Sequence, residues 1–386
     1  LLDPGNAVAL AGLQRIRPPV RRPVPSPEAL IAEARGALTQ GDHETAIDRF
    51  RRALMRDKGN ASAWNDLGLA YAGIGEIAEA REAFESAERL VPTPETIYNL
   101  GRLEAESGRY DDASMAYRSA LERDSSFAAA SLNLSSLQIQ AGHAPSAVVT
   151  LKKAMSASPE RGDIQVALAN AYLYIQEFES ARNAYERAAL DPHQLSAAYV
   201  GLGNVALAQS DTMGALDNYR QAIHENEYSA DPHINIGSVL AVQGQADSAI
   251  EAYRVALQKA PRDLTIYLNL ATLYYQSEQY EAALEHLGAL LKQNSGMPDA
   301  QRLLGHIALA TGDPDLAIEA YHIALSIAPS DLDALRGLAL AFEEDERVDA
   351  ARDAWLRWLE EADDRAGLES EIERIHTRLE ALPDNS

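Results

Sequence analysis

Residues 64–92 have the sequence WNDLGLAYAGIGEIAEAREAFESAERLVP. Small and large apolar residues recur in this segment at intervals of three and four, which is the spacing of one face of an α-helix. Gly75 divides the segment near its middle and Pro92 ends it. Glycine commonly terminates a helix, and proline cannot continue one. The segment therefore predicts two short helices joined by a tight turn.

The same arrangement recurs along the chain, and alanine marks its period. The alanines are 34 residues apart, with one step of 33: Ala46, Ala80, Ala113, Ala147, Ala181, Ala215, Ala249, Ala283, Ala317 and Ala351. A large residue follows each alanine by four positions, and a small residue, such as Gly68 or Gly203, precedes it by twelve. A period of 34 indicates a helix–turn–helix unit in which the small residue lets two helices approach closely.

The second unit carries the full signature of a known repeat: Trp64, Leu67, Gly68, Tyr71, Ala80, Phe84, Ala87 and Pro92. These residues resemble the tetratricopeptide repeat, and the resemblance extends over ten units. The first unit departs from the pattern at Glu33, where leucine is usual, and the tenth has Trp358 in place of alanine. The resemblance implies an all-α fold, a right-handed α-solenoid superhelix of tandem helix–turn–helix repeats. First helices would line its concave face and second helices its convex face.

The predicted organisation has three parts. Residues 1–26 form an N-terminal arm, and residues 364–386 form a capping helix and tail, with Leu368, Ile372, Ile375 and Leu379 at helical spacing. Ten repeats lie between them: 27–60, 61–93, 94–127, 128–161, 162–195, 196–229, 230–263, 264–297, 298–331 and 332–363.

The arm combines two kinds of sequence. Residues 6–17 could form a short helix with Leu10, Leu13 and Ile16 on one stripe, and residues 18–27 (PPVRRPVPSP) favour an extended polyproline conformation. One interpretation is a linker to a domain or anchor that has been removed. The other is a docking arm that packs against its own superhelix or a partner.

The charge is strongly acidic and unevenly distributed. The net charge is −24, although the first 26 residues carry +3. Such a body repels phosphates and anionic membranes, so we expect no nucleic acid partner and a neutral or basic protein segment instead. The sequence has no transmembrane segment and no cysteine, and Leu1 indicates a processed or truncated chain. These features favour an exported bacterial protein over a cytoplasmic one without fixing the compartment.

The sequence offers no pattern for catalysis. The nine histidines form no metal-ligand pair, and the segment GLGNVA at 201–206 lacks the preceding strand that a dinucleotide loop requires. The acidic stretch at 343–347 is interpreted as a solvated helix end. We therefore expect no catalytic residue, no cofactor and no metal site, and hence a non-enzymatic protein.

A partner-binding groove is predicted from the family pattern. If each marker alanine is position 20, positions 2, 5, 6, 9, 12 and 13 tend to face the concave surface in this family. The asparagines at positions 6 and 9 are Asn99, Asn133, Asn170, Asn204, Asn235 and Asn269. The apolar residues at positions 5 and 12 include Leu132, Val166, Val200, Ile234, Leu268 and Tyr275.

An asparagine amide offers one acceptor and two donors, so a row of them can hold an extended chain through its peptide groups. The row resembles the asparagine ladder in the superhelix of O-linked N-acetylglucosamine transferase. The alternative is that asparagine only tolerates a wet helix face or bonds the next helix. A carboxylate clamp is not expected, because no position 5 holds lysine and the only bases at that position are Arg302 and Arg336.

The main functional hypothesis is a non-enzymatic scaffold whose groove binds an extended or helical segment of another protein. The alternative is a structural subunit of a larger, multi-subunit complex that contacts partners through its outer surface and its N-terminal arm. A third reading is the non-catalytic arm of an enzyme whose catalytic part has been lost by truncation.

Overall fold

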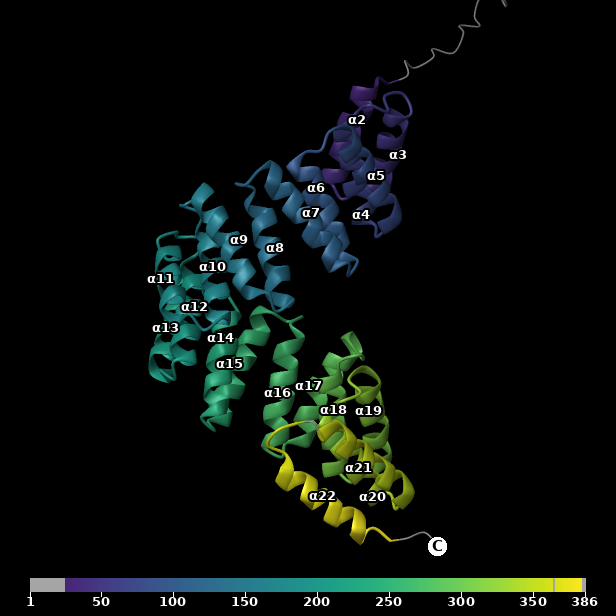
Figure 1. The fold of residues 1–386 in the computed structure, drawn as a ribbon, viewed down its shortest axis with the longest axis vertical. Helices are drawn as coiled ribbons and strands as arrows, with labels where there is room; N and C mark the ends of the chain where they lie inside the picture. Colours follow the sequence, from purple (N-terminus) through teal and green to yellow (C-terminus); the bar gives the residue numbers. More distant parts are fainter. Residues whose placement is uncertain (1–24, 364, 384–386) are drawn as a thin grey trace, which may run out of the picture. The chain divides into compact units, whose positions relative to one another are not determined.

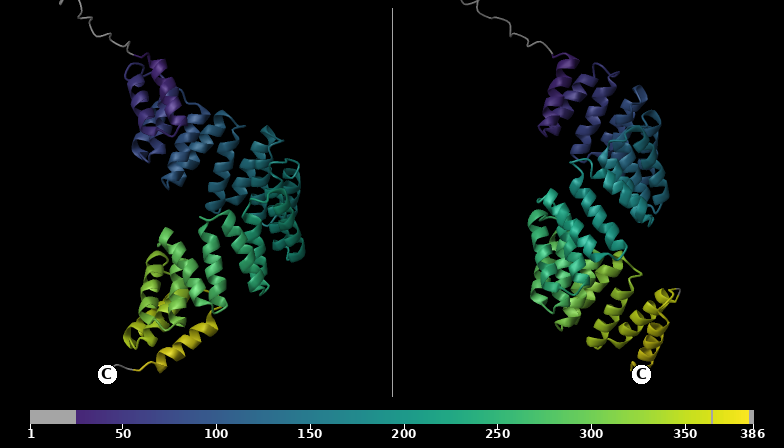
Figure 2. Two further views of the ribbon diagram at one scale, coloured as in Figure 1. Left: turned by 180° about the vertical axis from the view of Figure 1, so that it is seen from behind. Right: turned by 90° about the vertical axis from the view of Figure 1, so that its left-hand side faces the viewer.

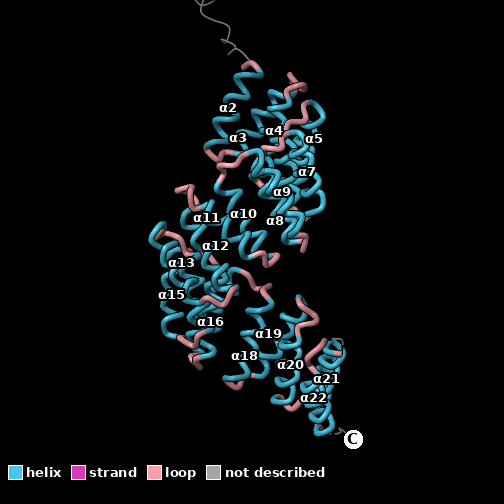
Figure 3. The backbone as a smooth tube through the Cα atoms, turned by 60° about the vertical axis from the view of Figure 1, so that its left-hand side comes forward, coloured by secondary structure: helices cyan, strands magenta, loops and turns pink. Residues whose placement is uncertain are grey.

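The computed structural model describes residues 25–363 and 365–383. These residues form 21 helices and no strand, and consecutive helices pair through short turns (Figures 1 and 3). The predicted all-α fold of tandem helix pairs is thus confirmed. The chain divides into two compact units, residues 1–184 and 185–386. The predicted helix at 6–17 and most of the polyproline stretch lie outside the described residues.

The first unit contains five first helices and the second helices that pair with them. The first helices are α2 (Pro27–Thr39), α4 (Ala61–Gly73), α6 (Pro94–Glu106), α8 (Ala128–Gln140) and α10 (Gly162–Tyr174). The second helices are α3 (His43–Leu54), α5 (Ile77–Leu90), α7 (Tyr110–Arg123), α9 (Ala144–Ala157) and α11 (Phe178–Ala188), whose last turn belongs to the second unit.

The second unit continues the same alternation, coloured teal to yellow in Figure 2. Its first helices are α12 (Leu195–Ala208), α14 (Asp231–Val242), α16 (Leu264–Gln276), α18 (Pro298–Ala310) and α20 (Leu332–Glu344). Its second helices are α13 (Thr212–Glu225), α15 (Ala246–Lys259), α17 (Tyr280–Gln293), α19 (Pro314–Ile327) and α21 (Val348–Ala362). The last helix, α22 (Glu369–Ala381), follows them.

Glycine ends the first helices, as the sequence predicts. Gly75, Gly108, Gly142, Gly244 and Gly312 all have φ between 73° and 79°. This left-handed conformation is free of steric cost only in glycine. Where the sequence lacks glycine at this turn, Gln176, Ser210, Glu278 and Glu346 adopt φ of 57–63°. The turn geometry of the repeat therefore overrides the preference of the individual residue.

The marker alanines are fully buried. Where the residue twelve positions earlier is glycine, it lies against the aromatic ring of the residue four positions after the alanine. A Cβ atom on Gly203 would lie 2.4 Å from the ring of Tyr219, and one on Gly305 would lie 2.5 Å from that of Tyr321. Gly201, the other glycine of the 201–206 segment, approaches the Tyr185 ring in the same way. Close helix packing thus accounts for both glycines of that segment.

Helix α22 packs on the last pair of the second unit. Ile375 and Leu379 are buried in the cluster that contains Trp358, and Leu368 and Ile372 pack against its edge. Glu343 at the end of α20 accepts hydrogen bonds from Trp355 Nε1 (2.6 Å) and from two nitrogens of Arg378 on α22 (both 2.7 Å). The interpretation of residues 343–347 as a solvated helix end is therefore wrong for Glu343.

In the part of the chain that the structure describes, no helix combines the length and the apolar character needed to cross a membrane.

Candidate partner-binding site

The predicted asparagines all lie on first helices. Asn99, Asn133 and Asn170 are on α6, α8 and α10 of the first unit, and Asn204, Asn235 and Asn269 are on α12, α14 and α16 of the second. Asn170 is exposed and the other five are half-buried. The main-chain N–H groups there are used by the helix itself, so a side chain, water or ligand must donate to each amide oxygen.

In the first unit, side chains of successive first helices reach one another. Asn99 Nδ2 donates to Asn65 Oδ1 on α4 at 3.1 Å. Asn133 Nδ2 donates to the hydroxyl oxygens of Tyr98 on α6 (3.2 Å) and Tyr117 on α7 (3.4 Å). The structure thus brings the predicted Asn99 and Asn133 onto one face with Asn65 and Tyr98. Sequence reasoning did not include Asn65, although it occupies position 5 of its repeat.

In the second unit, Asn204 is the centre of a similar group. Its Oδ1 accepts from the hydroxyl of Tyr219 at 2.7 Å and from Asn235 Nδ2 at 3.3 Å. Within the described residues, the Asn269 side chain forms no hydrogen bond. The three asparagines of this unit therefore differ in role: Asn204 and Asn235 are bonded to each other, whereas the Asn269 amide keeps its full bonding capacity.

Buried tyrosine hydroxyls explain part of this polar pattern. On three second helices, the tyrosine four residues after the marker alanine bonds a polar side chain fifteen residues earlier. The pairs are Tyr219 with Asn204 (2.7 Å), Tyr253 with Ser238 (2.9 Å) and Tyr321 with His306 (2.8 Å). Burial raises the pKa of Tyr219 to about 12, so this hydroxyl stays neutral and needs a partner. The residue at position 9 thus pairs with a buried tyrosine hydroxyl, in addition to its predicted role in binding.

Two asparagine pairs share one donor direction, and we call Asn65–Asn99 and Asn204–Asn235 the amide pairs. In each, the later asparagine donates Nδ2 to Oδ1 of the earlier one. The earlier residue then keeps its Nδ2 donors, and the later residue keeps its Oδ1 acceptor. Each amide pair can therefore meet one carbonyl and one N–H of another chain.

The six predicted apolar site residues, Leu132, Val166, Val200, Ile234, Leu268 and Tyr275, are all half-buried. Ile234 packs against the core cluster of Tyr253 and Leu270, and Leu268 and Tyr275 pack against the cluster of Leu287 and Leu303. These three residues therefore support the repeat and also leave part of their surface exposed, with Ile234 and Leu268 directly preceding Asn235 and Asn269.

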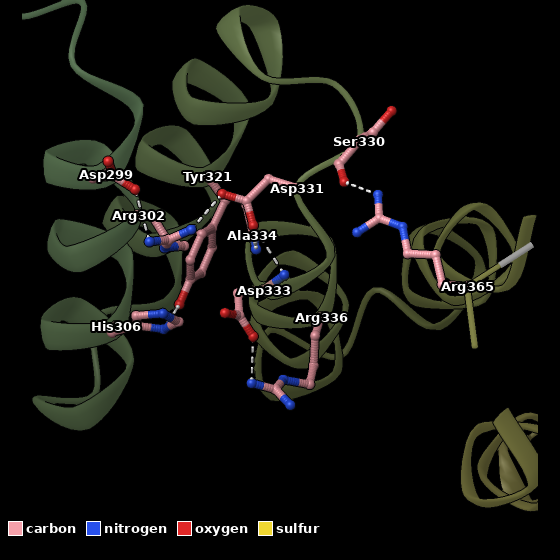
Figure 4. A network of polar contacts seen from close by, with 10 residues as sticks. All are labelled: Asp299, Arg302, His306, Tyr321, Ser330, Asp331, Asp333, Ala334, Arg336 and Arg365. Atoms are coloured by element: carbon pink, nitrogen blue, oxygen red, sulfur yellow. Dashed lines mark hydrogen bonds and ion pairs between the residues drawn. The ribbon is translucent and has the colours of Figure 1, made fainter. Parts of the chain in front are cut away.

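The two arginines at position 5, Arg302 and Arg336, are already paired with acids (Figure 4). Arg302 contacts Asp299 at 2.8 Å and Asp331 at 2.7 Å. Arg336 contacts Asp333 at 2.7 Å and Glu371 at 3.0 Å. In the described structure, carboxylates therefore neutralise both arginines, which disfavours them as anchors for an acidic ligand.

His306 lies inside this network, beside Tyr321 (Figure 4). Burial lowers the pKa of its imidazole, and the nearby Arg302 lowers it further, so the ring is neutral at physiological pH. Among the described residues, no group of three or more histidine, aspartate or glutamate side chains is placed to hold a metal ion.

The fold and this surface define a class, the α-helical repeat proteins built from 34-residue helix pairs. A family model described as tetratricopeptide repeat matches residues 31–93, 98–161, 200–263, 268–331 and 302–366. These matches cover more than half of the chain, and the protein belongs to the tetratricopeptide repeat family. Proteins of this family are typically non-catalytic and generally mediate binding.

Two solved structures of IFIT1 show the same fold. The human IFIT1 dimer with m7Gppp-AAAA has a TM-score of 0.50 and 19% identity, over 88% of this chain and 91% of that one. A monomeric IFIT1 mutant with Gppp-AAAA has a TM-score of 0.53 and 18% identity, over 93% and 91%. A tetratricopeptide repeat protein from Parabacteroides merdae has a TM-score of 0.47 and 19% identity, over 64% and 98%. At these identities the two IFIT1 structures show the fold alone. No curated protein matches the chain.

Proposed function

We propose that this protein is a non-enzymatic scaffold whose first helices bind an extended segment of a partner protein through that segment's main chain. The observation that carries the proposal is the amide pair, which occurs in both units with the same donor direction. In each pair, the Nδ2 group of the earlier asparagine and the Oδ1 atom of the later one remain as a donor and an acceptor for a ligand.

The internal hydrogen bond of each amide pair helps the proposed binding. It fixes the orientation of both amides before a ligand arrives, so less side-chain freedom is lost on binding. One hydrogen bond contributes about 0.5–1.5 kcal/mol net, so two pairs alone would give weak affinity. Half-buried apolar neighbours such as Ile234 and Leu268 would supply the remaining contact area.

Electrostatics supports a neutral or basic partner. The chain carries a net charge of −24, and Arg302 and Arg336 are paired with carboxylates. The IFIT1 structures were solved with m7Gppp-AAAA and Gppp-AAAA, but phosphates would meet strong repulsion on this acidic protein. We therefore propose a peptide ligand and no nucleic acid.

The test uses a library of unstructured, uncharged 15-residue peptides as the probe. The peptides that bind the wild-type protein are selected. Their affinities for the wild-type protein are compared with their affinities for a variant carrying Asn65→Ala, Asn99→Ala and Asn235→Ala. Loss of at least ten-fold in affinity is expected. The control is Asn183→Ala, which removes an exposed amide on the second helix α11.

Unchanged affinity in the triple variant, with circular dichroism showing an intact helical fold, would contradict the proposed binding mode. Equal loss in the control would show that the measurement reports on general surface polarity instead.

A further inference from the structure

The first unit has a pocket of about 720 Å³ on the side of the second helices. It lies between α3 and α5, and α4 forms its floor with Trp64, Leu67 and Tyr71. Trp64 Nε1 donates to the carbonyl oxygen of Lys58 at 3.0 Å, which fixes the indole in the floor. Met55 at the end of α3 lines the pocket and is 71% exposed. The pocket therefore offers an apolar floor with uncovered apolar surface at one end.

The rim of this pocket carries an excess of acid. Its charged lining residues are Glu44, Glu76, Glu79, Glu82, Arg51 and Lys58. Within the described residues, none of the four glutamates has an ion pair or a side-chain hydrogen bond. An apolar floor with unpaired glutamates around it matches a segment that combines apolar residues with arginine.

The chain itself enters the first unit at the edge of this pocket. The Pro25 carbonyl accepts a hydrogen bond from Arg56 Nη1, and Ser26 caps the first helix, α2. Arg56 directly follows Met55, the exposed residue of the pocket lining. Whatever precedes Pro25 in the chain is thus attached beside the end of α3.

The residues that precede Pro25 have the composition that the pocket requires. Residues 10–22 contain Leu10, Leu13 and Ile16 together with four arginines at positions 15, 17, 21 and 22. Ile16 is nine residues before Pro25, a span of up to roughly 30 Å when extended. Helix α3 has 12 residues and is about 18 Å long, so the segment can reach both ends of the pocket.

We propose that this pocket is a docking site for the chain's own residues 10–22, with their apolar side chains on the Trp64 floor and their arginines against the rim glutamates. Attachment at Pro25 makes the contact intramolecular, which gives an effective concentration on the order of millimolar and fills even a weak site. A basic, apolar segment of another protein would have to displace this arm. The site uses no residue of the amide pairs, so it is independent of the function proposed above.

The chain contains no cysteine, which makes a disulfide test direct. The full-length variant with Ile16→Cys and Met55→Cys is oxidised mildly and the intramolecular disulfide is followed over time. The control joins Ile16→Cys to Met115→Cys, since Met115 is 59% exposed on α7 of the same unit. We expect the pocket pair to form its disulfide at least ten-fold faster, at a rate independent of protein concentration.

A second pair of variants tests the charge match. Glu79→Lys with Glu82→Lys, both exposed residues of α5, should slow disulfide formation at Met55→Cys several-fold and leave the control rate unchanged. Equal rates for the two cysteine pairs, or a rate unaffected by the charge reversal, would overturn the proposal. A rate that rises in proportion to protein concentration would also overturn it, because a second copy would then supply the arm.

Discussion

Replacing Asn204 by leucine tests whether the asparagines of the candidate site also hold the repeats together. The Tyr219 ring on α13 is fully buried, and its hydroxyl donates to Asn204 Oδ1 at 2.7 Å. Asn204→Leu keeps a side chain of similar size on α12 but removes the acceptor. The hydroxyl then stays buried without a partner, and Asn235 loses its acceptor as well.

The expected loss of stability in each variant follows from the polar groups that the variant leaves without a hydrogen-bond partner. A stranded buried hydroxyl costs about 1–3 kcal/mol, so Asn204→Leu should destabilise α12 and α13 by that amount. Tyr219→Phe removes one hydrogen bond but leaves a half-buried amide that still accepts from Asn235, so we expect about 0.5–1.5 kcal/mol. The double variant with Asn204→Leu and Tyr219→Phe has no buried hydroxyl without a partner. Its loss of stability should therefore be smaller than the sum of the two single losses by about 1 kcal/mol.

Hydrogen exchange of the α12 and α13 amides measures the local free energy of opening directly. The control is Asn269→Leu on α16, where the described structure has no side-chain hydrogen bond to lose, and the expected effect is within about 0.5 kcal/mol. Equal effects of Asn204→Leu and Asn269→Leu, or strict additivity of Asn204→Leu and Tyr219→Phe, would refute the reasoning.

Three further predictions follow from packing, protonation and backbone geometry. Gly305→Ala would place a Cβ atom 2.5 Å from the Tyr321 ring and should lower stability by about 1–3 kcal/mol in thermal melts. The control is Gly288→Ala on α17, where the new Cβ atom would meet no other side chain or helix within 4 Å, and it should instead stabilise the protein by about 0.5–1 kcal/mol. Burial raises the pKa of Glu343, but hydrogen bonds from Arg378 and Trp355 outweigh it and leave the pKa below 4.5. Its contribution to α22 docking is therefore present above pH 4.5 and is lost as pH falls through the lowered pKa; tryptophan fluorescence should follow this loss, and Glu343→Gln should abolish the pH dependence. Ser210→Gly relieves a φ of 63° and should raise the melting temperature, equivalent to about 1 kcal/mol, and an unchanged or lower value would contradict the assigned strain.

The repeat was predictable because each of its characteristic residue types is required by the local geometry of a helix contact or a turn. An alanine every 34 residues, a glycine under a ring and a glycine at the turn need no knowledge of the rest of the chain. Even the departures are local: the turn keeps its left-handed residue at Ser210 and Glu278, where no glycine is present.

The site was predictable only in part, because its contacts join neighbouring repeats. Sequence phase placed Asn99, Asn133 and Asn235 on first helices, but it did not show that Asn99 bonds Asn65. One signal was available for Asn204, since a polar residue fifteen positions before a buried tyrosine recurs at Ser238.

The pocket and the role of Glu343 were not predictable from the repeat pattern. The pocket is a gap between α3 and α5, and a sequence pattern assigns side chains to helix faces without giving the spaces between helices. By sequence, Glu343 is one of several acids in a stretch predicted to be solvated. Its bond to Arg378, 35 residues later, depends on how α22 docks.

Binding of a peptide and its backbone-methylated copy tests main-chain recognition most directly. The peptide is one selected from the uncharged 15-residue library, and N-methylation of alternate peptide bonds removes N–H donors without changing any side chain. We predict that methylation weakens binding to the wild-type protein at least ten-fold, as expected for two lost hydrogen bonds of about 1 kcal/mol each. It should have little effect on a variant with Asn99→Ala and Asn235→Ala, which lacks the proposed acceptors. Equal affinity of the wild-type protein for both peptides would contradict the account.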